Sequence, residues 1–265
     1  MCEKPGIPVY PAQMRTIKVA MCQIFSLDGD RRGNFTRIEN AISQAKDAGA
    51  EIICFPEAVI LGWVNNDAYK RAYPIPGRDS DRLCELSKNY QIYLCVGLAE
   101  KEGANLYDSV ILIDDKGRIL LKHRKINILT ELMTPPYTPG NSVNAIETRF
   151  GKIGLLICAD THEDEILKRM AALKPNLLLV PYGYAAAEDE WPGHGKELEN
   201  VVKNTAKITR SPVVGTNLVG VITKGPWKGR VYGGHSVAVE RTGKTISIAR
   251  DRDRDINIVC LSVCI

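Results

Sequence analysis

Cys158 is the first residue in this sequence whose type and position suggest covalent chemistry. It follows the apolar run 153–157 and precedes a polar turn, 161–164. Helical periodicity begins within that turn, at Glu163. A thiol between a strand and the N-terminus of a helix can have a lowered pKa and act as a nucleophile. A cysteine after an apolar strand is, by itself, more often a small buried hydrophobe. The remainder of the chain has to decide between these two interpretations.

Two more reactive side chains occupy comparable positions. Glu57 follows a short apolar run that ends at a proline, and Lys125 ends the basic run 122–125. Because strand ends in α/β proteins meet at one rim of the sheet, a carboxylate, an ammonium and a thiol could converge there. Each residue also has a plainer explanation. A glutamate after a proline often supplies charge at a helix N-terminus, and a lysine in a basic run usually faces solvent.

The elements that would have to position these groups can be predicted from hydrophobic periodicity. Strands are expected over 16–24, 51–55, 92–98, 106–113, 118–122, 143–148, 152–157, 176–180, 213–218, 235–240, 245–249 and 256–263. Helices are expected over 34–48, around Leu83 and Leu86, and over 163–173 and 197–209, while 183–195 looks polar and irregular. Hairpins interrupt the alternation of strands and helices, which predicts an α/β fold with mixed sheets in a single domain.

Composition excludes several classes of protein. A net charge of +4 over 265 residues, without a basic cluster interleaved with aromatics, argues against nucleic-acid binding. No apolar run has the roughly 18 residues of a membrane span. The eight cysteines are irregularly spaced, and several lie in expected apolar strands (Cys22, Cys54, Cys95 and Cys260). This pattern favours reduced, buried thiols in a cytoplasmic protein, and no spacing suggests a zinc site or another metal.

Residues 1–13 contain three prolines and no apolar stretch of signal-peptide length. They are expected to form a flexible extension, with the folded domain spanning 14–265. The motifs of other catalytic classes are missing from the sequence, including the Gly-x-Ser-x-Gly elbow of serine hydrolases. Residues 243–245 imitate the end of a P-loop, but Ala238 replaces its first glycine and a strand is expected to follow.

Three short motifs follow one another in a distinctive order: FPEA at 55–58, RKI at 124–126 and CAD at 158–160. Their order and spacing resemble the nitrilase superfamily of carbon–nitrogen hydrolases, and the resemblance covers roughly residue 17 to the C-terminus. It implies a four-layer αββα sandwich with two mixed sheets, assembled as a homodimer or a larger homo-oligomer. It also implies a cofactor-free hydrolase with a small-molecule amide, carbamoyl or nitrile substrate.

The resemblance also assigns roles to individual residues. Cys158 would attack the substrate carbon, and Glu57 would move the protons. Lys125 would stabilise the oxyanion together with the backbone N–H of Ala159. Many family members carry a further glutamate on the loop after the lysine. Glu131 is the candidate here, although it could equally be a loop carboxylate in water.

Some positions depart from the family pattern. Amidase-type members usually continue Cys-x-Asp with an arginine and a Pro-Glu pair, which this chain lacks at 161–164. Asp160, where true nitrilases have a glutamate, favours hydrolysis of an amide or N-carbamoyl amine. Asp108 stands where an asparagine is common and is expected to be structural.

Aromatic residues after predicted strands are candidates for the substrate pocket: Trp63, Tyr182 and Trp191. They could equally pack its rim. Two alternatives to an amidase stay open, namely a nitrilase that converts a nitrile to an acid and ammonia, and a binding or scaffold protein of the same shape without turnover.

Overall fold

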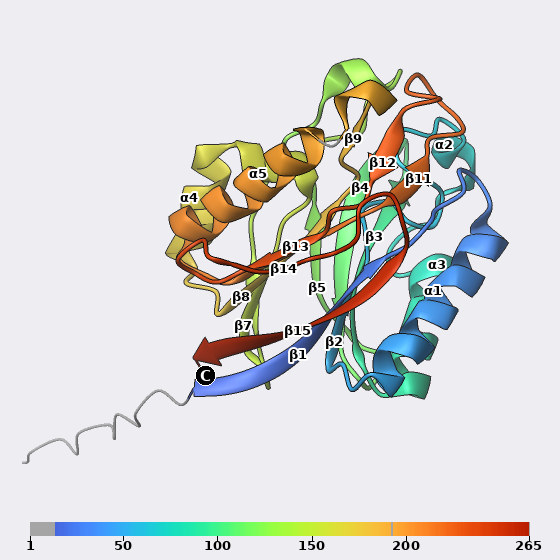
Figure 1. Cartoon of the computed structure of the whole chain (residues 1–265). Coiled ribbons are helices and arrows are strands. Elements are labelled where there is room, and N and C mark those ends of the chain that lie inside the picture. Colours follow the sequence, from blue (N-terminus) through green and yellow to red (C-terminus); the bar gives the residue numbers. More distant parts are fainter. Residues whose placement is uncertain (1–13, 192, 265) are drawn as a thin grey trace, which may run out of the picture.

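The chain folds into four layers, with two sheets face to face and helices on the outer face of each (Figure 1). The structure is a computed structural model that describes residues 14–191 and 193–264. The extension expected at 1–13 lies outside the described residues. The predicted αββα sandwich of two mixed sheets is confirmed.

The first sheet has the strand order β15-β1-β2-β3-β4-β5. Its strands are β1 (Met14–Gln23), β2 (Ile52–Cys54), β3 (Tyr93–Glu102), β4 (Asn105–Ile113), β5 (Ile119–Arg124) and β15 (Asp255–Cys264). The β1–β2 and β2–β3 pairs are parallel, and the β15–β1, β3–β4 and β4–β5 pairs are antiparallel. The parallel centre places the end of β2, and so Glu57, in the middle of the sheet.

The second sheet repeats this plan in the order β14-β13-β10-β8-β7-β6. Its strands are β6 (Ala145–Thr148), β7 (Gly151–Leu155), β8 (Leu177–Tyr182), β10 (Val213–Asn217), β13 (Val237–Val239) and β14 (Thr245–Ile248). Strands β7, β8 and β10 are parallel, and the outer pairs are antiparallel. Cys158 therefore follows β7, which lies next to the edge strand β6 of the second sheet, and Glu57 follows β2 in the middle of the first.

Helices cover both sheets (Figure 1). The first sheet is covered by α1 (Arg31–Asp47) and α3 (Arg78–Tyr90), and the second by α4 (Asp164–Ala172) and α5 (Gly193–Thr209). The apolar stripe of α1 is the predicted one, with Ile38, Ala41, Ile42 and Ala45 buried. Its first turn is capped by the Asp30 carboxylate, which accepts a hydrogen bond from the Gly33 N–H at 3.0 Å.

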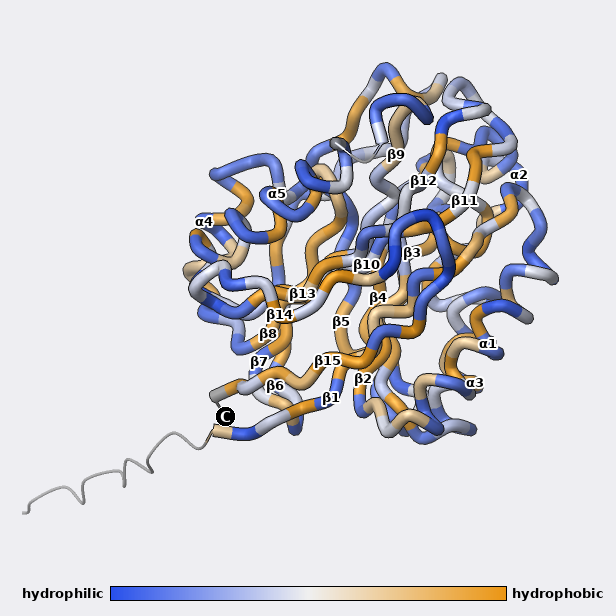
Figure 2. The backbone as a smooth tube through the Cα atoms, viewed as in Figure 1, coloured by the Kyte–Doolittle hydropathy of each residue, from blue (hydrophilic) through white to orange (hydrophobic). Residues whose placement is uncertain are grey.

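Two apolar cores follow from this layering, and Figure 2 shows apolar residues along the strands of both sheets. One core lies between the first sheet and its helices and includes Ile38, Leu83 and Leu94. The other lies between the two sheets and extends to α4 and α5, with Ile52 and Leu178 among its members. Alternate residues of a strand thus enter different cores, which also separates the polar side chains of one strand onto two faces.

Several short elements were not expected from the sequence. Strands β9 (Ala185–Ala186), β11 (Val219–Val221) and β12 (Val231–Gly233) form a small third sheet. A short helix, α2 (Ala68–Arg71), and three 3-10 turns, η1 (Thr130–Leu132), η2 (Cys158–His162) and η3 (Glu188–Glu190), complete the described elements. Segments this short carry too few residues to show a periodicity. Helix α5 also begins at Gly193 rather than at Glu197.

One expectation about the cysteines is wrong. Cys22, Cys54 and Cys95 are buried and free, but Cys260 is exposed. The reason is that β15 is an edge strand in which Val259 and Leu261 face inward, so that the residue between them faces out. Among the helices of the described residues, none has the length and apolarity that crossing a membrane requires.

Candidate active site

Glu57 and Lys125 form a buried pair between the sheets. Lys125 Nζ lies 2.5 Å from Glu57 Oε1, and the two side chains are 4% and 0% exposed. The residues come from the turn after β2 and from the residue directly after β5. The basic run 122–125 is therefore not a uniformly solvated face. Lys125, the last residue of this run, is directed inward.

Two glycines allow the main chain to approach Glu57 closely. A Cβ at Gly97 would lie 2.7 Å from the Glu57 Cα, so only glycine lets β3 pass this turn. On the other side, the Gly183 N–H donates to Glu57 Oε2 at 2.6 Å. The Glu57 N–H also donates to the Tyr182 carbonyl at 3.3 Å. These contacts tie the first sheet to the end of β8 in the second and fix the orientation of the carboxylate.

Cys158 lies at the start of the 3-10 turn η2, with a positive φ of 38°. This left-handed conformation is unusual for a side-chain-bearing residue and is found preferentially at functional sites. The Thr161 hydroxyl stabilises the turn by donating to the Cys158 carbonyl at 2.6 Å. Ala159 is the next residue of the same turn and is also buried.

The electrostatic environment of Cys158 differs from the one expected. Burial and the neighbouring Glu57 carboxylate raise the pKa of the Cys158 thiol well above its ordinary value, although Lys125 acts in the opposite direction. The lowering that a helix N-terminus can cause is not found: η2 separates Cys158 from α4, which begins only at Asp164. A thiol held in its neutral form requires a base that removes its proton as it attacks.

Lys125 remains cationic in spite of its burial. Desolvation works to lower its pKa, but Glu57, Cys158 and Asp108 together raise the pKa well above its ordinary value. A buried ammonium that is paired with carboxyl groups and lies near a thiol is suited to stabilise negative charge on a neighbouring oxygen. The combination of cation, base and neutral thiol therefore fits nucleophilic acyl chemistry.

Asp160 joins the segments that carry Lys125 and Cys158. Its Oδ1 accepts hydrogen bonds from the backbone N–H groups of Ile126 at 2.8 Å and Asn127 at 2.9 Å. Its Oδ2 accepts from the Ile157 N–H at 3.0 Å and lies 2.8 Å from His123 Nε2. The sequence analysis assigned neither Asp160 nor His123 a positioning role. The alternation of β5, which directs 123 and 125 to one face, was the available signal.

The three aromatic candidates differ in how closely they approach the residues Glu57, Lys125 and Cys158. Lys125 Nζ lies 5.7 Å from the centroid of the Trp63 ring. Tyr182 is fully buried, and its hydroxyl lies 3.0 Å from Thr161 Oγ1. Trp191 contacts the His194 ring edge-on, and His194 stacks on Tyr184 with ring centroids 4.0 Å apart. These rings lie between Trp191 and the pair formed by Glu57 and Lys125.

Tyr184 was not selected from the sequence, although its ring contacts the candidate Tyr182 edge-on. Burial, with a smaller contribution from Cys158, raises its pKa to about 12. It follows Gly183, the residue that donates to Glu57. The position directly after a strand, two residues beyond Tyr182, was the signal that could have identified it.

The structure does not bring Glu131 to Glu57 and Lys125. Glu131 lies on the exposed turn η1, while the neighbouring Leu132 and Met133 are buried. The carboxyl group found near Lys125 is that of Asp108, whose Oδ2 lies 3.5 Å from Lys125 Nζ. Asp108 was expected to be structural, so this contact adds a titratable group to the site.

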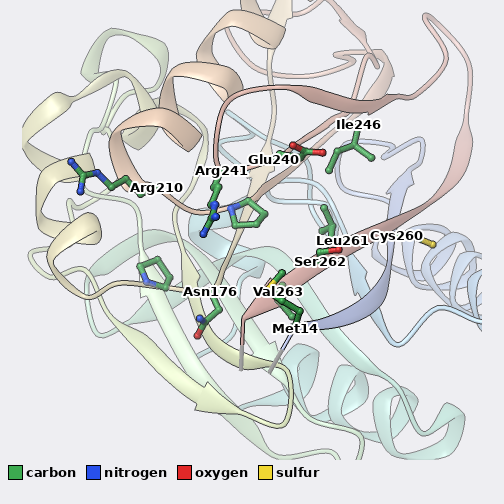
Figure 3. Close-up of a pocket in the computed structure, with 12 residues that line it drawn as sticks. Met14, Asn176, Arg210, Glu240, Arg241, Ile246, Cys260, Leu261, Ser262 and Val263 are labelled. Atoms are coloured by element: carbon green, nitrogen blue, oxygen red, sulfur yellow. The ribbon is translucent and has the colours of Figure 1, made fainter. Parts of the chain in front are cut away.

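Two cavities differ in their relation to these residues. A very small one, about 10 Å³, lies between Trp63, Lys125 and Tyr137. A much larger one, about 340 Å³, is drawn in Figure 3. It is lined by residues of β15 and by Arg210, Glu240 and Arg241, and none of its lining residues belongs to the cluster around Cys158. Cavity volume therefore does not identify the site.

Within residues 14–191 and 193–264, no group of three or more His, Cys, Asp and Glu side chains is arranged to hold a metal ion. The polar groups of the site are instead directed at one another or at backbone N–H groups.

Comparisons with known proteins agree with this geometry. The family described as carbon-nitrogen hydrolase matches residues 18–263. A bifunctional nitrilase/nitrile hydratase of Lupinus angustifolius is 30% identical over 196 residues, which cover 66% of this chain and 55% of that protein. The chain thus spans about half the length of this relative. An omega-amidase of Mus musculus is 27% identical over 249 residues, covering 89% of this chain and 85% of that protein.

Solved structures share the fold. The amidase from Nesterenkonia sp. has a TM-score of 0.81 at 21% identity, covering 97% of this chain and 94% of that one. A variant of the Nesterenkonia sp. AN1 amidase, with a TM-score of 0.80 at 21% identity and coverage of 92% and 90%, carries the acetamide moiety of fluoroacetamide on its active-site cysteine. At this identity the likeness shows the fold.

Proposed function

Because the chain belongs to the carbon-nitrogen hydrolase family, we propose that it hydrolyses a small amide or N-carbamoyl amine and releases ammonia. The observation that supports this most is the buried contact between Glu57 and Lys125 at 2.5 Å, next to a thiol whose pKa burial raises. Cys158 is the proposed nucleophile, Glu57 the proton carrier and Lys125 the oxyanion-stabilising cation.

The proposed reaction begins with the neutral thiol. Glu57 takes the Cys158 proton while the sulfur attacks the carbonyl carbon, and the carbonyl oxygen becomes an oxyanion near Lys125 Nζ. The backbone N–H of Ala159 is the proposed second donor. When the C–N bond breaks, Glu57 returns the proton to the leaving nitrogen, and a thioester remains on the sulfur.

Water completes the proposed cycle. Glu57, which has given up its proton, takes one from a water molecule that attacks the thioester carbon, and returns it to the Cys158 sulfur as the acid product leaves. Trp63, Tyr182 and Trp191 are proposed to border the substrate. Aromatic rings at the border of the pocket favour an uncharged acyl group of modest size. The role that the family resemblance implies for Glu131, on the exposed turn η1, is not part of the reaction proposed here.

Ammonia release from matched substrates tests the function. Butyramide, N-propylurea and butyronitrile carry the same propyl chain on an amide, an N-carbamoyl amine and a nitrile. We expect ammonia from the amide or the urea, and none from the Cys158→Ala variant. Mass spectrometry of the quenched reaction should find the acyl group on Cys158. Absence of both signals, together with a Cys158 that iodoacetamide does not alkylate, would favour the binding or scaffold alternative.

The nitrilase alternative is favoured by one finding, the 30% identity to the lupin nitrilase/nitrile hydratase. In that case the thiol would add to the nitrile carbon to give a thioimidate, which water converts to acid and ammonia. Ammonia from butyronitrile at a rate above that from butyramide would establish this alternative.

Two further expectations belong to the same proposal. We expect the protein to assemble as a homodimer or a larger homo-oligomer and to act in the cytoplasm. Light scattering of the purified protein measures the first, and cell fractionation the second.

A further inference from the structure

Asp108 is the buried titratable residue that the reaction above does not use. It lies on β4 with a side chain that is 0% exposed, and its Oδ2 is 3.5 Å from Lys125 Nζ. The Lys125 N–H also donates to the Asp108 carbonyl at 2.8 Å, so the two residues are held side by side through the backbone. Neither carboxyl oxygen of Asp108 has a hydrogen-bond partner among the described residues.

We propose that Asp108, rather than Glu131, is the second carboxyl group that positions Lys125 for hydrolysis. This inference rests on the proposed function. Lys125 is the only cation within contact of Asp108 among the ion pairs of the described residues, and Glu57 occupies the shorter contact with the same ammonium. A side chain with two carboxyl neighbours has less freedom to leave the position next to Cys158 than one with a single neighbour.

The charge balance indicates the protonation state of Asp108. The site buries Lys125, Glu57, Asp108 and Cys158 together, and a second carboxylate without hydrogen bonds would be costly there. Burial, followed by the negative charge of Glu57, raises the pKa of Asp108 well above its ordinary value, although Lys125 opposes the shift. The raised pKa favours the neutral acid form of Asp108.

Other groups around Asp108 support the neutral form. Asp160 on η2, paired with His123, contributes in the same direction as Glu57. The Tyr137 hydroxyl is buried, and burial followed by Asp108 and Glu57 raises its pKa well above the ordinary value, so it stays neutral as well. Glu100, on the neighbouring strand β3, bonds Ser109 and Arg124 on the opposite face of the sheet.

Ionisation of Asp108 should therefore oppose catalysis. As the pH rises through its pKa, a second negative charge appears beside Lys125, and this charge disfavours the thiolate of Cys158. An asparagine at this position keeps the shape and the neutral state but cannot ionise. An alanine removes the contact with Lys125 altogether.

The test compares Asp108→Ala, Asp108→Asn and Glu131→Gln, with Asp47→Asn on the exposed end of α1 as a control for loss of one carboxylate. Two quantities are measured across a neutral-to-alkaline pH series, butyramide hydrolysis and iodoacetamide alkylation of Cys158 followed by peptide mass spectrometry. We expect Asp108→Ala to lower kcat about tenfold or more while KM changes by less than about threefold. Glu131→Gln should change neither parameter beyond the range of the control.

The Asp108→Asn variant keeps the proposal testable if the alanine variant does not fold. We expect Cys158 alkylation in this variant to rise at a pH about one unit lower than in the wild type, because no second negative charge then opposes the thiolate. An unshifted profile, or a loss in Glu131→Gln as large as that in Asp108→Ala, would overturn the proposal. If the wild-type chain hydrolyses no test substrate, the proposed function fails, while alkylation of Cys158 still decides the role of Asp108.

Discussion

Two carboxyl–cation clusters lie on opposite faces of the first sheet. The outer cluster consists of Glu100 with Lys122 and Arg124, and the inner cluster of Glu57 and Asp108 with Lys125. Both central carboxylates are almost fully buried, with Glu100 1% exposed and Glu57 0%. The clusters are similar in composition but differ in how completely their groups are bonded.

The outer cluster is saturated. Glu100 accepts hydrogen bonds from Ser109 at 2.7 Å, from Lys122 at 2.6 Å and from Arg124 at 2.6 and 2.9 Å. The inner cluster leaves both oxygens of Asp108 without a partner and keeps a neutral thiol beside a base. A saturated cluster can only hold the strands together, whereas the unsaturated one can exchange protons and bind a substrate. The difference separates a structural role from a chemical one.

The largest expected effect follows from removing the base of the inner cluster. Glu57→Gln should lower kcat for butyramide by about 10³-fold, because the neutral thiol then has no group that takes its proton. Thermal unfolding should confirm that the variant is folded. Glu102→Gln, which removes an exposed partner of Arg124, is the matched control and should keep wild-type turnover. Wild-type turnover in Glu57→Gln would contradict the assignment of roles to the two clusters.

A smaller loss of kcat is expected when the inner cluster is left intact but Asp160, which holds its segments in place, is changed. Asp160→Asn loses an acceptor for the backbone N–H groups of Ile126 and Ile157, which fix the segments of Lys125 and Cys158. We expect kcat to fall about 100-fold and the free energy of unfolding to fall by about 2 kcal/mol. Urea unfolding and ammonia release measure the two effects. A loss of stability with unchanged kcat would show that Asp160 is purely structural.

The outer cluster should affect stability and not turnover. Glu100→Gln removes the shared acceptor of Lys122 and Arg124, both of which remain partly solvated, so we expect a loss of about 2 kcal/mol in the free energy of unfolding. Turnover of the folded variant should stay near the wild-type value. Glu102→Gln should cost clearly less, since its side chain is 59% exposed. Lost turnover in folded Glu100→Gln would break the distinction between the clusters.

The smallest effect concerns pH and sharpens the same distinction. Although burial opposes it, hydrogen bonds from Arg124, Lys122 and Ser109 lower the pKa of Glu100. Its stabilisation is therefore present above the unfolded pKa of about 4.3 and is lost as the pH falls through the lower folded value. The difference in unfolding free energy between wild type and Glu100→Gln should shrink from neutral pH to pH ~3. A constant difference would show that Glu100 is not ionised in the folded state.

Much of the fold could be predicted because it depends on local patterns. The period of α1 and the alternation of the strands identify which residues are buried, and the hairpins imply mixed sheets. The short elements β9, β11 and β12 could not be predicted. They are stabilised by pairing with each other, and strands of two or three residues have no pattern of their own.

By itself the sequence determined which reactive groups are available and in what order: a carboxylate at 57, a lysine at 125 and a thiol at 158, each following a strand. Only the tertiary structure decided that Asp108 and not Glu131 lies beside Lys125, and that the pKa of Cys158 is raised rather than lowered. The physical reason is that a side chain's chemistry is a local property. Its burial and its charged neighbours are set by segments that are distant in the chain and meet only when the two sheets pack together.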